Sequence, residues 1–244
     1  NMSNQLNDFS FFYSNNLNLT TEKVYVFLIN LDFFDFTDFI GLLSNNEVKR
    51  ADKMKTKKKK RQYIITRGMI KKLLSIIIDK DPHKIEFSYN HHGKPFINEK
   101  YNGYSVEFNT SHSGVYGLIA ITLDNKVGVD IQKIKPEIDF RALSNRFFSN
   151  HERNELLKLE KHEQQEAFYL GWVRKESFIK ATGMGVAYGL DRFSVSLNKE
   201  DNSNFIISDY ENKKWHCYNL IEIGNYKTAL TTCKNNIDIL ISQP

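Results

Sequence analysis

The sequence is poor in cysteine and proline and has no long apolar run. It contains two cysteines and four prolines among 244 residues. Cys217 and Cys233 form no closely spaced pair, so they imply neither a disulfide framework nor a zinc site, and we expect buried thiols in late strands. The longest strongly apolar segment, near residues 73–78, is far shorter than the ~20 residues that cross a membrane. We therefore expect a cytoplasmic protein without a membrane partner.

What the chain does contain is enough apolar material for a substantial core. Apolar residues make up 41% of the sequence, which includes 18 phenylalanines and can support one or two domains. The formal net charge of +5 favours acidic partners in general, such as nucleic acid, a membrane surface or an acidic protein. The basic run 57–61 most simply forms the solvated face of a long helix, although it could also hold a ligand or attract an acidic protein.

Hydrophobic periodicity predicts helices and strands in both halves of the chain. In the first half, a helical region is expected at 44–78, and strands are predicted at 23–28, 85–87, 117–123 and 128–132. In the second half, Ser149 and Glu152 have the spacing of a capping box that opens a helix. A further helix follows at 163–181, and strands are predicted at 191–197, 205–208, 215–222 and 227–232. The fold class indicated is α+β.

One motif, WVRKESFIKATGMG, places an acid and a base one helical turn apart. Residues four apart share a helix face, so Glu176 and Lys180 can contact the same small ligand. Gly183 suits the left-handed position that ends a helix. The alternative is an ordinary exposed Glu–Lys pair, which stabilises a helix by a few tenths of a kcal/mol, on the order of 0.3.

A second motif, GVDIQ, alternates like a strand and puts Asp130 and Gln132 on one face. A carboxylate at a strand end is a suitable ligand for a hard cation such as magnesium. Glu176 would supply a second carboxylate, with substrate phosphate filling the remaining positions. Alternatively, Asp130 caps a turn through its own backbone.

With both motifs in view, the chain resembles the Sfp-type 4′-phosphopantetheinyl transferases, which activate carrier proteins of peptide and polyketide synthases. The resemblance extends over roughly residues 20–235. The further motifs that carry it are, in chain order, a basic helix with Arg61, HGKP at 92–95, FNTSHS at 108–113, RFFSNHE at 146–152 and FSV at 193–195.

The resemblance implies a fold, a reaction and a set of partners. The fold would be two similar α+β halves packed as a pseudo-dimer, with residues 1–124 contacting coenzyme A and residues 125–244 holding the metal and catalytic groups. A serine of an apo acyl or peptidyl carrier protein would attack the β-phosphate of coenzyme A, and 3′,5′-ADP would leave. We expect a monomer that binds no nucleic acid.

The resemblance also implies roles for particular residues. Magnesium, or manganese in its place, would be held by Asp130, Glu176 and Gln132. Glu176, directly or through a metal-bound water, would take the serine proton, and Lys180 would stabilise the pyrophosphate and the leaving group. Many family members have a glutamate where this chain has Gln132, so the site has one negative charge fewer.

Coenzyme A needs cationic and hydrogen-bonding groups around its phosphates. By resemblance these are Lys94, Ser111, His112, Arg61 and Arg50. From the residues alone, His112 could equally be a turn residue that bonds its own backbone. Two other functions stay open: a catalytically weakened family member, and a basic protein that binds nucleic acid through residues 55–61. A nucleic-acid-binding function would give no role to the motifs WVRKESFIKATGMG and GVDIQ.

Overall fold

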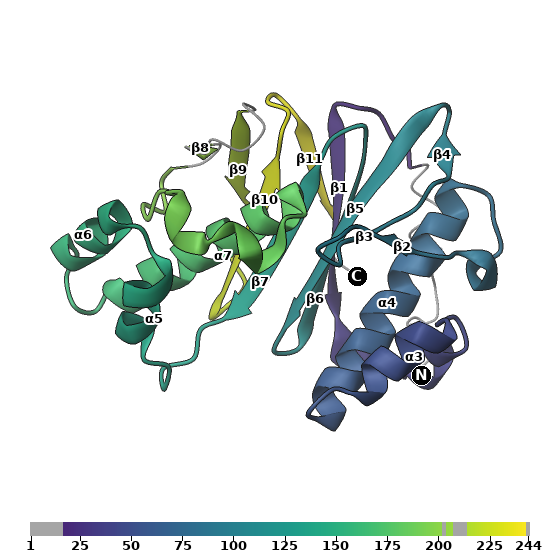
Figure 1. The fold of residues 1–244 in the computed structure, drawn as a ribbon, viewed down its shortest axis with the longest axis horizontal. Helices are drawn as coiled ribbons and strands as arrows, with labels where there is room; N and C mark the ends of the chain where they lie inside the picture. The colour runs from purple at the N-terminus through teal and green to yellow at the C-terminus, as the bar shows by residue number, and fades with distance from the viewer. Residues whose placement is uncertain (1–16, 202–203, 207–213, 243–244) are drawn as a thin grey trace.

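The structure is a computed structural model that describes residues 17–201, 204–206 and 214–242. Two halves lie side by side, and each consists of a β-sheet with one long helix against it (Figure 1). The long helix is α4, Lys57–Ile77, in the first half and α7, Gln164–Thr182, in the second. The α+β prediction is confirmed. A pseudo-twofold relation between the halves, and the division into 1–124 and 125–244, stay predictions.

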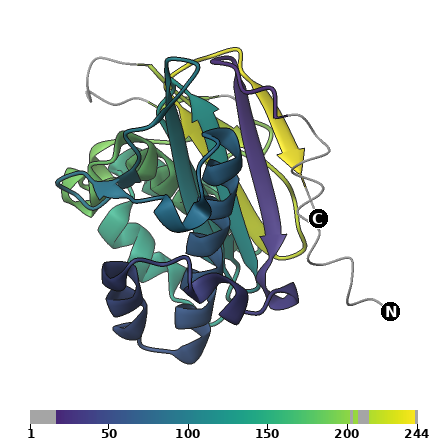
Figure 2. The same cartoon turned by 90° about the vertical axis from the view of Figure 1, so that its right-hand side faces the viewer.

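The first sheet has five strands in the order β11-β1-β6-β5-β4. Its three long strands pair antiparallel, β1 with β6 and β6 with β5. The last strand of the chain, β11, pairs in parallel with β1, and the two lie together at the sheet edge in Figure 2. The strands predicted at 23–28 and 117–123 are confirmed as β1 and β6. The bounds are β1 Lys23–Asn30, β4 Lys100–Tyr101, β5 Tyr104–Ser113, β6 Tyr116–Leu123 and β11 Asp238–Ser242.

The second sheet has four strands in the order β7-β10-β9-β8. The strands predicted at 128–132, 215–222 and 227–232 are present as β7, a shorter β9 and β10. Part of the strand predicted at 205–208 is β8, and its last two residues lie outside the described residues. The bounds are β7 Val127–Lys133, β8 Asn204–Ile206, β9 Trp215–Asn219 and β10 Tyr226–Thr232.

The strand predicted at 191–197 is wrong, since a short 3-10 helix, η4 Leu190–Arg192, leads into irregular chain. Side chains satisfy the backbone of this segment where a neighbouring strand would otherwise do so. Lys175 donates to Phe193 O at 2.6 Å, and Arg174 donates to Ser196 O at 2.7 Å. The apolar alternation in the sequence is therefore real, but carbonyl groups of the segment accept from buried cations and the amide of Val195 donates to the Glu152 carboxylate.

The helical region predicted at 44–78 is two helices, α3 Asn45–Asp52 and α4. Ser44 and Glu47 form the capping box that begins α3, and the Thr56 hydroxyl accepts from Lys59 N to begin α4. The strand predicted at 85–87 is displaced to β2. The remaining elements are η1 Leu31–Phe33, α2 Thr37–Ile40, η2 Pro82–Lys84, β2 Ser88–Tyr89, β3 Pro95–Phe96, α5 Phe140–Phe147, α6 Asn150–Lys158 and η3 Gly185–Tyr188.

The core has layers that follow from the alternation along the strands. One face of the first sheet packs on α4, and its other face packs on the second sheet. On β7, Val129 and Ile131 enter the core between the sheets, so Gly128, Asp130 and Gln132 are turned toward α7. None of the helices among the described residues combines the length and the apolar character of a membrane span.

Glycine at position 128 allows β7 and α7 to approach closely. A Cβ atom at Gly128 would lie 2.1 Å from Ser177 O and 2.3 Å from Ala181 N, both of them backbone atoms of α7. We expect Gly128→Ala to reduce the free energy of unfolding by about 1–3 kcal/mol or more, because the helix must shift away from the strand. Urea denaturation measures this.

Gly41→Ala is the matched control for that substitution. Gly41 has φ −65° and ψ −17°, and no atom lies within 4 Å of its hypothetical Cβ. Alanine there should be neutral or slightly stabilising. If both variants unfold at the parent's urea concentration, the close approach at Gly128 does not exist in solution.

Candidate active site

The strand β7 brings Asp130 to the junction of the two halves. Its carboxylate is buried, with 1% exposure, and accepts hydrogen bonds on one oxygen from both halves. Ser111 of β5 donates to Asp130 Oδ1 at 2.8 Å, and Lys180 of α7 lies 2.6 Å from the same atom. Lys180 also donates to Ser111 Oγ at 3.0 Å. Three residues predicted from separate motifs are therefore in direct contact.

Glu176 lies one turn before Lys180 on α7, as the helical spacing predicted. Burial and the nearby charge of Asp130 raise the pKa of Glu176 to about 7, against the opposing effect of Lys180. The carboxylate has no hydrogen-bond or ion-pair partner among the described residues. Two carboxylates that repel each other in a buried place are a suitable setting for a cation.

Gln132 completes the oxygen-rich face of β7. Its side-chain amide donates to Asp130 Oδ2 at 3.1 Å. A 180° rotation of that amide would present the oxygen to the same space. Asp130, Gln132 and Glu176 thus offer hard oxygen donors, the kind that magnesium prefers, and the donor set fits this ion.

His112 follows Ser111 on β5 and pairs with Gly117 of β6. Burial and the charge of Lys180 lower the pKa of His112, although Asp130 acts in the opposite direction. The imidazole is therefore neutral at pH 7, and it can donate one hydrogen bond to a ligand.

Lys94 lies in the loop between β2 and β3, which packs on the end of α7. Its ammonium donates to Val127 O at 3.0 Å and to Ala181 O at 3.2 Å, and burial lowers the pKa of Lys94 to about 8. The amide of Asn90 in the same loop donates to Gly183 O at 2.7 Å. Lys94 therefore joins the two halves, and one of its three N–H groups is left for a ligand.

Arg61 and Arg50 do not take part in the contacts around Asp130. Arg61 donates to Leu31 O at 2.7 Å and to Phe34 O at 2.6 Å, so it holds the segment around η1. Arg50 is exposed, and its guanidinium lies over the ring of Tyr63 at 5.9 Å. Their assignment to coenzyme A stays a prediction.

Glu152 is a structural residue, in line with its place in the sequence. The predicted capping box with Ser149 is confirmed. The same carboxylate also lies 2.7 Å from the ammonium of Lys175, and both side chains have 0% exposure. The lysine next to Glu176 in the motif thus supports α7 from the opposite side.

Sequence reasoning missed two residues of β5, Asn109 and Ser113, which bond backbone amides of β7. The signal that could have found them is spacing, because Asn109, Ser111 and Ser113 alternate and must share one face of a strand. The segment FNTSHS was not interpreted as a strand, so this face was not recognised.

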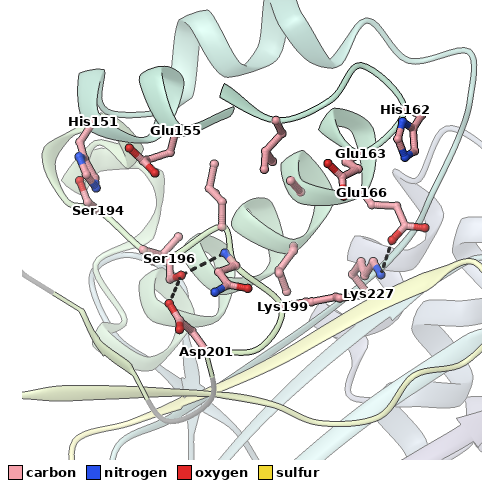
Figure 3. A pocket seen from close by; sticks show the side chains of 16 residues that line it. His151, Glu155, His162, Glu163, Glu166, Ser194, Ser196, Lys199, Asp201 and Lys227 are labelled. Atoms are coloured by element: carbon pink, nitrogen blue, oxygen red, sulfur yellow. Dashed lines mark hydrogen bonds and ion pairs between the residues drawn. The ribbon is translucent and has the colours of Figure 1, made fainter. Parts of the chain in front are cut away.

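A hollow of about 830 Å³ lies elsewhere, between α6, α7, the segment after η4 and β10 (Figure 3). Its polar side chains partly satisfy one another, since Lys227 lies 3.2 Å from Glu166, and Ser196 donates to Asp201 at 2.5 Å. None of the predicted site residues lines it. The hollow adjoins the residues around Asp130 through Lys227, which is paired with Gln132 in the β10–β7 ladder. The candidate active site is therefore the cluster at Asp130.

Comparison with known proteins identifies the class. Residues 126–231 match the 4′-phosphopantetheinyl transferase superfamily, and residues 33–123 match the N-terminal region of a 4′-phosphopantetheinyl transferase. The 4′-phosphopantetheinyl transferase HetI of Nostoc sp. is 30% identical over 75% of this chain and 77% of its own length. A putative 4′-phosphopantetheinyl transferase of Synechocystis sp. is 30% identical over 81% of this chain and 82% of its own.

The chain belongs to the 4′-phosphopantetheinyl transferase superfamily. Within it, the chain is of the Sfp type: Sfp of Bacillus subtilis is 32% identical over 70% of this chain and 74% of its own length. It is accordingly a transferase. The solved structure of Thermotoga maritima holo-acyl-carrier-protein synthase covers 45% of this chain and 62% of that chain, with 18% identity and a TM-score of 0.31.

Proposed function

We propose that this protein transfers the 4′-phosphopantetheine arm of coenzyme A to a serine of an apo acyl or peptidyl carrier protein. The observation that carries the proposal is the contact of Asp130, Ser111 and Lys180, with Glu176 beside them, at the junction of the halves of a chain from this family. Such a cluster offers a base, a cation and hydrogen-bond donors in one place.

The serine oxygen attacks the phosphorus of the β-phosphate and forms a new P–O bond. The bond from that phosphorus to the oxygen that bridges the two phosphates breaks, and 3′,5′-ADP leaves with the electron pair. Glu176 takes the serine proton. Burial and Asp130 raise the pKa of Glu176 to about 7 in the metal-free site, which favours its acting as a base, and bound magnesium would oppose that shift.

Asp130, Glu176 and Gln132 would hold magnesium. When bound, the ion would neutralise negative charge on the pyrophosphate. Lys180 contributes a further positive charge, and its ammonium contacts Asp130, Ser111 and Val129 O. A phosphate oxygen can replace one of these acceptors when coenzyme A binds.

The nucleotide end of coenzyme A has a candidate place on α4. The hydroxyls of Tyr63 and Thr66 are buried and have no hydrogen-bond partner among the described residues. Buried polar groups are normally satisfied, so a polar ligand is a natural partner. Arg50 and Arg67 both lie near the Tyr63 ring, at 5.9 and 5.4 Å from its centre to the guanidinium carbon. Arg67 already lies 3.6 Å from the Glu47 carboxylate, so the exposed Arg50 is the better candidate for the 3′-phosphate.

Gln132→Glu tests the metal part of the proposal. A carboxylate there would add a negative charge beside Asp130 and should lower the magnesium concentration for half-maximal rate about three- to tenfold. A magnesium titration of the transfer rate in parent and variant measures this. An unchanged requirement would mean that Gln132 is not a ligand in any useful sense.

The function itself is tested by intact-mass measurement. An apo acyl carrier protein and an apo peptidyl carrier protein are each incubated with the protein, coenzyme A and magnesium, with Glu176→Ala as the control. A gain of one phosphopantetheine arm that is lost in the variant supports the proposal. No gain on either carrier, with magnesium or manganese, contradicts it. Nucleic-acid binding that survives Glu176→Ala in a protein without transfer activity would instead favour the basic binding protein.

A further inference from the structure

The strand that carries Asp130 has one edge that no other strand of the described residues covers with its backbone. On its other side β7 pairs with β10. On this edge, three alternate backbone N–H groups of β7 donate to side chains of β5. Val129 N donates to Asn109 Oδ1 at 2.9 Å, Ile131 N to Ser111 Oγ at 3.4 Å and Lys133 N to Ser113 Oγ at 3.0 Å.

The carbonyl groups of the same edge are also bonded to side chains. Val127 O accepts from Lys94, and Val129 O accepts from Lys180. Polar side chains from both halves therefore make the hydrogen bonds along this edge of β7. In a continuous sheet the backbone of a neighbouring strand would make them. Several of these side chains also belong to the candidate site.

The middle member of the β5 series, Ser111, bonds Asp130 directly, whereas Asn109 and Ser113 bond only the backbone on either side. Asp130 lies between the amides of Val129 and Ile131, and Gln132 lies between those of Ile131 and Lys133. The positions of the two metal-ligand candidates on β7, Asp130 and Gln132, therefore follow from the hydrogen bonds that flank them.

We propose that Asn109 and Ser113 are positioning residues, which set Asp130 and Gln132 at the correct distance from Ser111, His112 and the bound substrate. This inference rests on the proposed function. It predicts a specific loss, because a shift of the strand misplaces the reacting groups while leaving each of them present. A purely structural role would reduce stability without changing how the site responds to magnesium.

Ser113 offers the cleaner test, since it is only half-buried and its removal should leave the protein folded. We expect Ser113→Ala to lower kcat about three- to tenfold and to raise the magnesium concentration for half-maximal rate by a similar factor. The KM for coenzyme A at saturating magnesium should change less than about twofold. Ser113→Thr keeps the hydroxyl and should restore both parameters.

Ser105→Ala is the matched control, because Ser105 is exposed on the same face of β5, and it should behave as the parent. Asn109→Ala should act in the same direction as Ser113→Ala, with circular dichroism to verify that it is folded. The inference is overturned if Ser113→Ala keeps the parent's kcat and magnesium response, or if Ser113→Thr fails to restore them.

Calorimetric titration of coenzyme A at several magnesium concentrations separates this inference from the proposed function. Weaker magnesium-dependent binding to Ser113→Ala than to the parent supports the inference even if the parent transfers nothing, in which case only the proposed function fails. Equal binding overturns the inference. A parent that neither transfers nor binds coenzyme A overturns both.

Discussion

Replacing Glu176 with glutamine is expected to reduce the transfer rate about 10²- to 10⁴-fold, the usual contribution of a positioned base. Glutamine has nearly the same shape but cannot take the serine proton. It also removes one of the two carboxylates that would hold magnesium. Initial rates on an apo carrier protein, measured across a series of magnesium concentrations, quantify the loss.

The same substitution is expected to stabilise the metal-free protein at neutral and higher pH. Burial and Asp130 raise the pKa of Glu176 from its usual 4.5 to about 7, so its ionisation opposes folding. The penalty is absent below about pH 4.5, grows as the pH rises toward 7 and is complete above it, with an upper limit of about 3 kcal/mol. Thermal melts in the presence of a chelator should give Glu176→Gln a higher melting temperature than the parent at pH 8. At pH 5 the two melting temperatures should be equal.

Glu163→Gln is the matched control, because Glu163 is exposed at the start of the same helix. It should leave the transfer rate and both melting temperatures at the parent's values. A Glu176→Gln variant that transfers within about tenfold of the parent would remove Glu176 as the base. A variant that melts at the parent's temperature at pH 8 would mean that neither burial nor Asp130 disfavours the charged form of Glu176.

Replacing Lys175 with methionine is expected to reduce the free energy of unfolding by about 3–5 kcal/mol. The ammonium of Lys175 lies 2.7 Å from Glu152 and 2.6 Å from Phe193 O in a place with 0% exposure for both charged side chains. Without it, the Glu152 carboxylate stays buried with no opposite charge. Because total stabilities are about 5–15 kcal/mol, this change should lower the urea midpoint strongly.

Two further variants show whether the loss comes from the unpaired charge. Lys158→Met breaks an exposed pair with Glu155 at 2.6 Å, where the lysine side chain is 70% exposed, and should cost less than about 1 kcal/mol. Adding Glu152→Leu to Lys175→Met removes the stranded carboxylate and should recover part of the stability. Equal losses for Lys175→Met and Lys158→Met would show that burial does not strengthen the pair.

The sequence predicted the parts of the site that depend on local periodicity. Helical spacing placed Glu176 and Lys180 on one face of α7, and strand alternation placed Asp130 and Gln132 on one face of β7. Gly183 ends α7 with φ 72°, as expected from its residue type. These features depend only on residues that are close in the sequence, so they can be predicted from the sequence alone.

What the sequence did not predict depends on contacts between distant segments. The two carbonyls of the second half that accept from the Lys94 ammonium were not predicted, and its contact with a phosphate stays a prediction. The bond from the Arg61 guanidinium to Leu31 O was not predicted either, and its contact with coenzyme A stays a prediction. A cation in a motif can bond either a ligand or a chain carbonyl, and only the fold shows which acceptor comes within reach.

The pairing of β11 with β1 affects how the chain folds during synthesis. The five residues Asp238–Ser242 form the edge of a sheet whose first strand begins at Lys23. During synthesis the edge of β1 has no β11 to pair with until residues 238–242 have left the ribosome. Contacts between such distant segments slow folding, and an open strand edge can pair with another chain in the meantime. We therefore expect chaperones that shield exposed strand edges to assist the nascent chain.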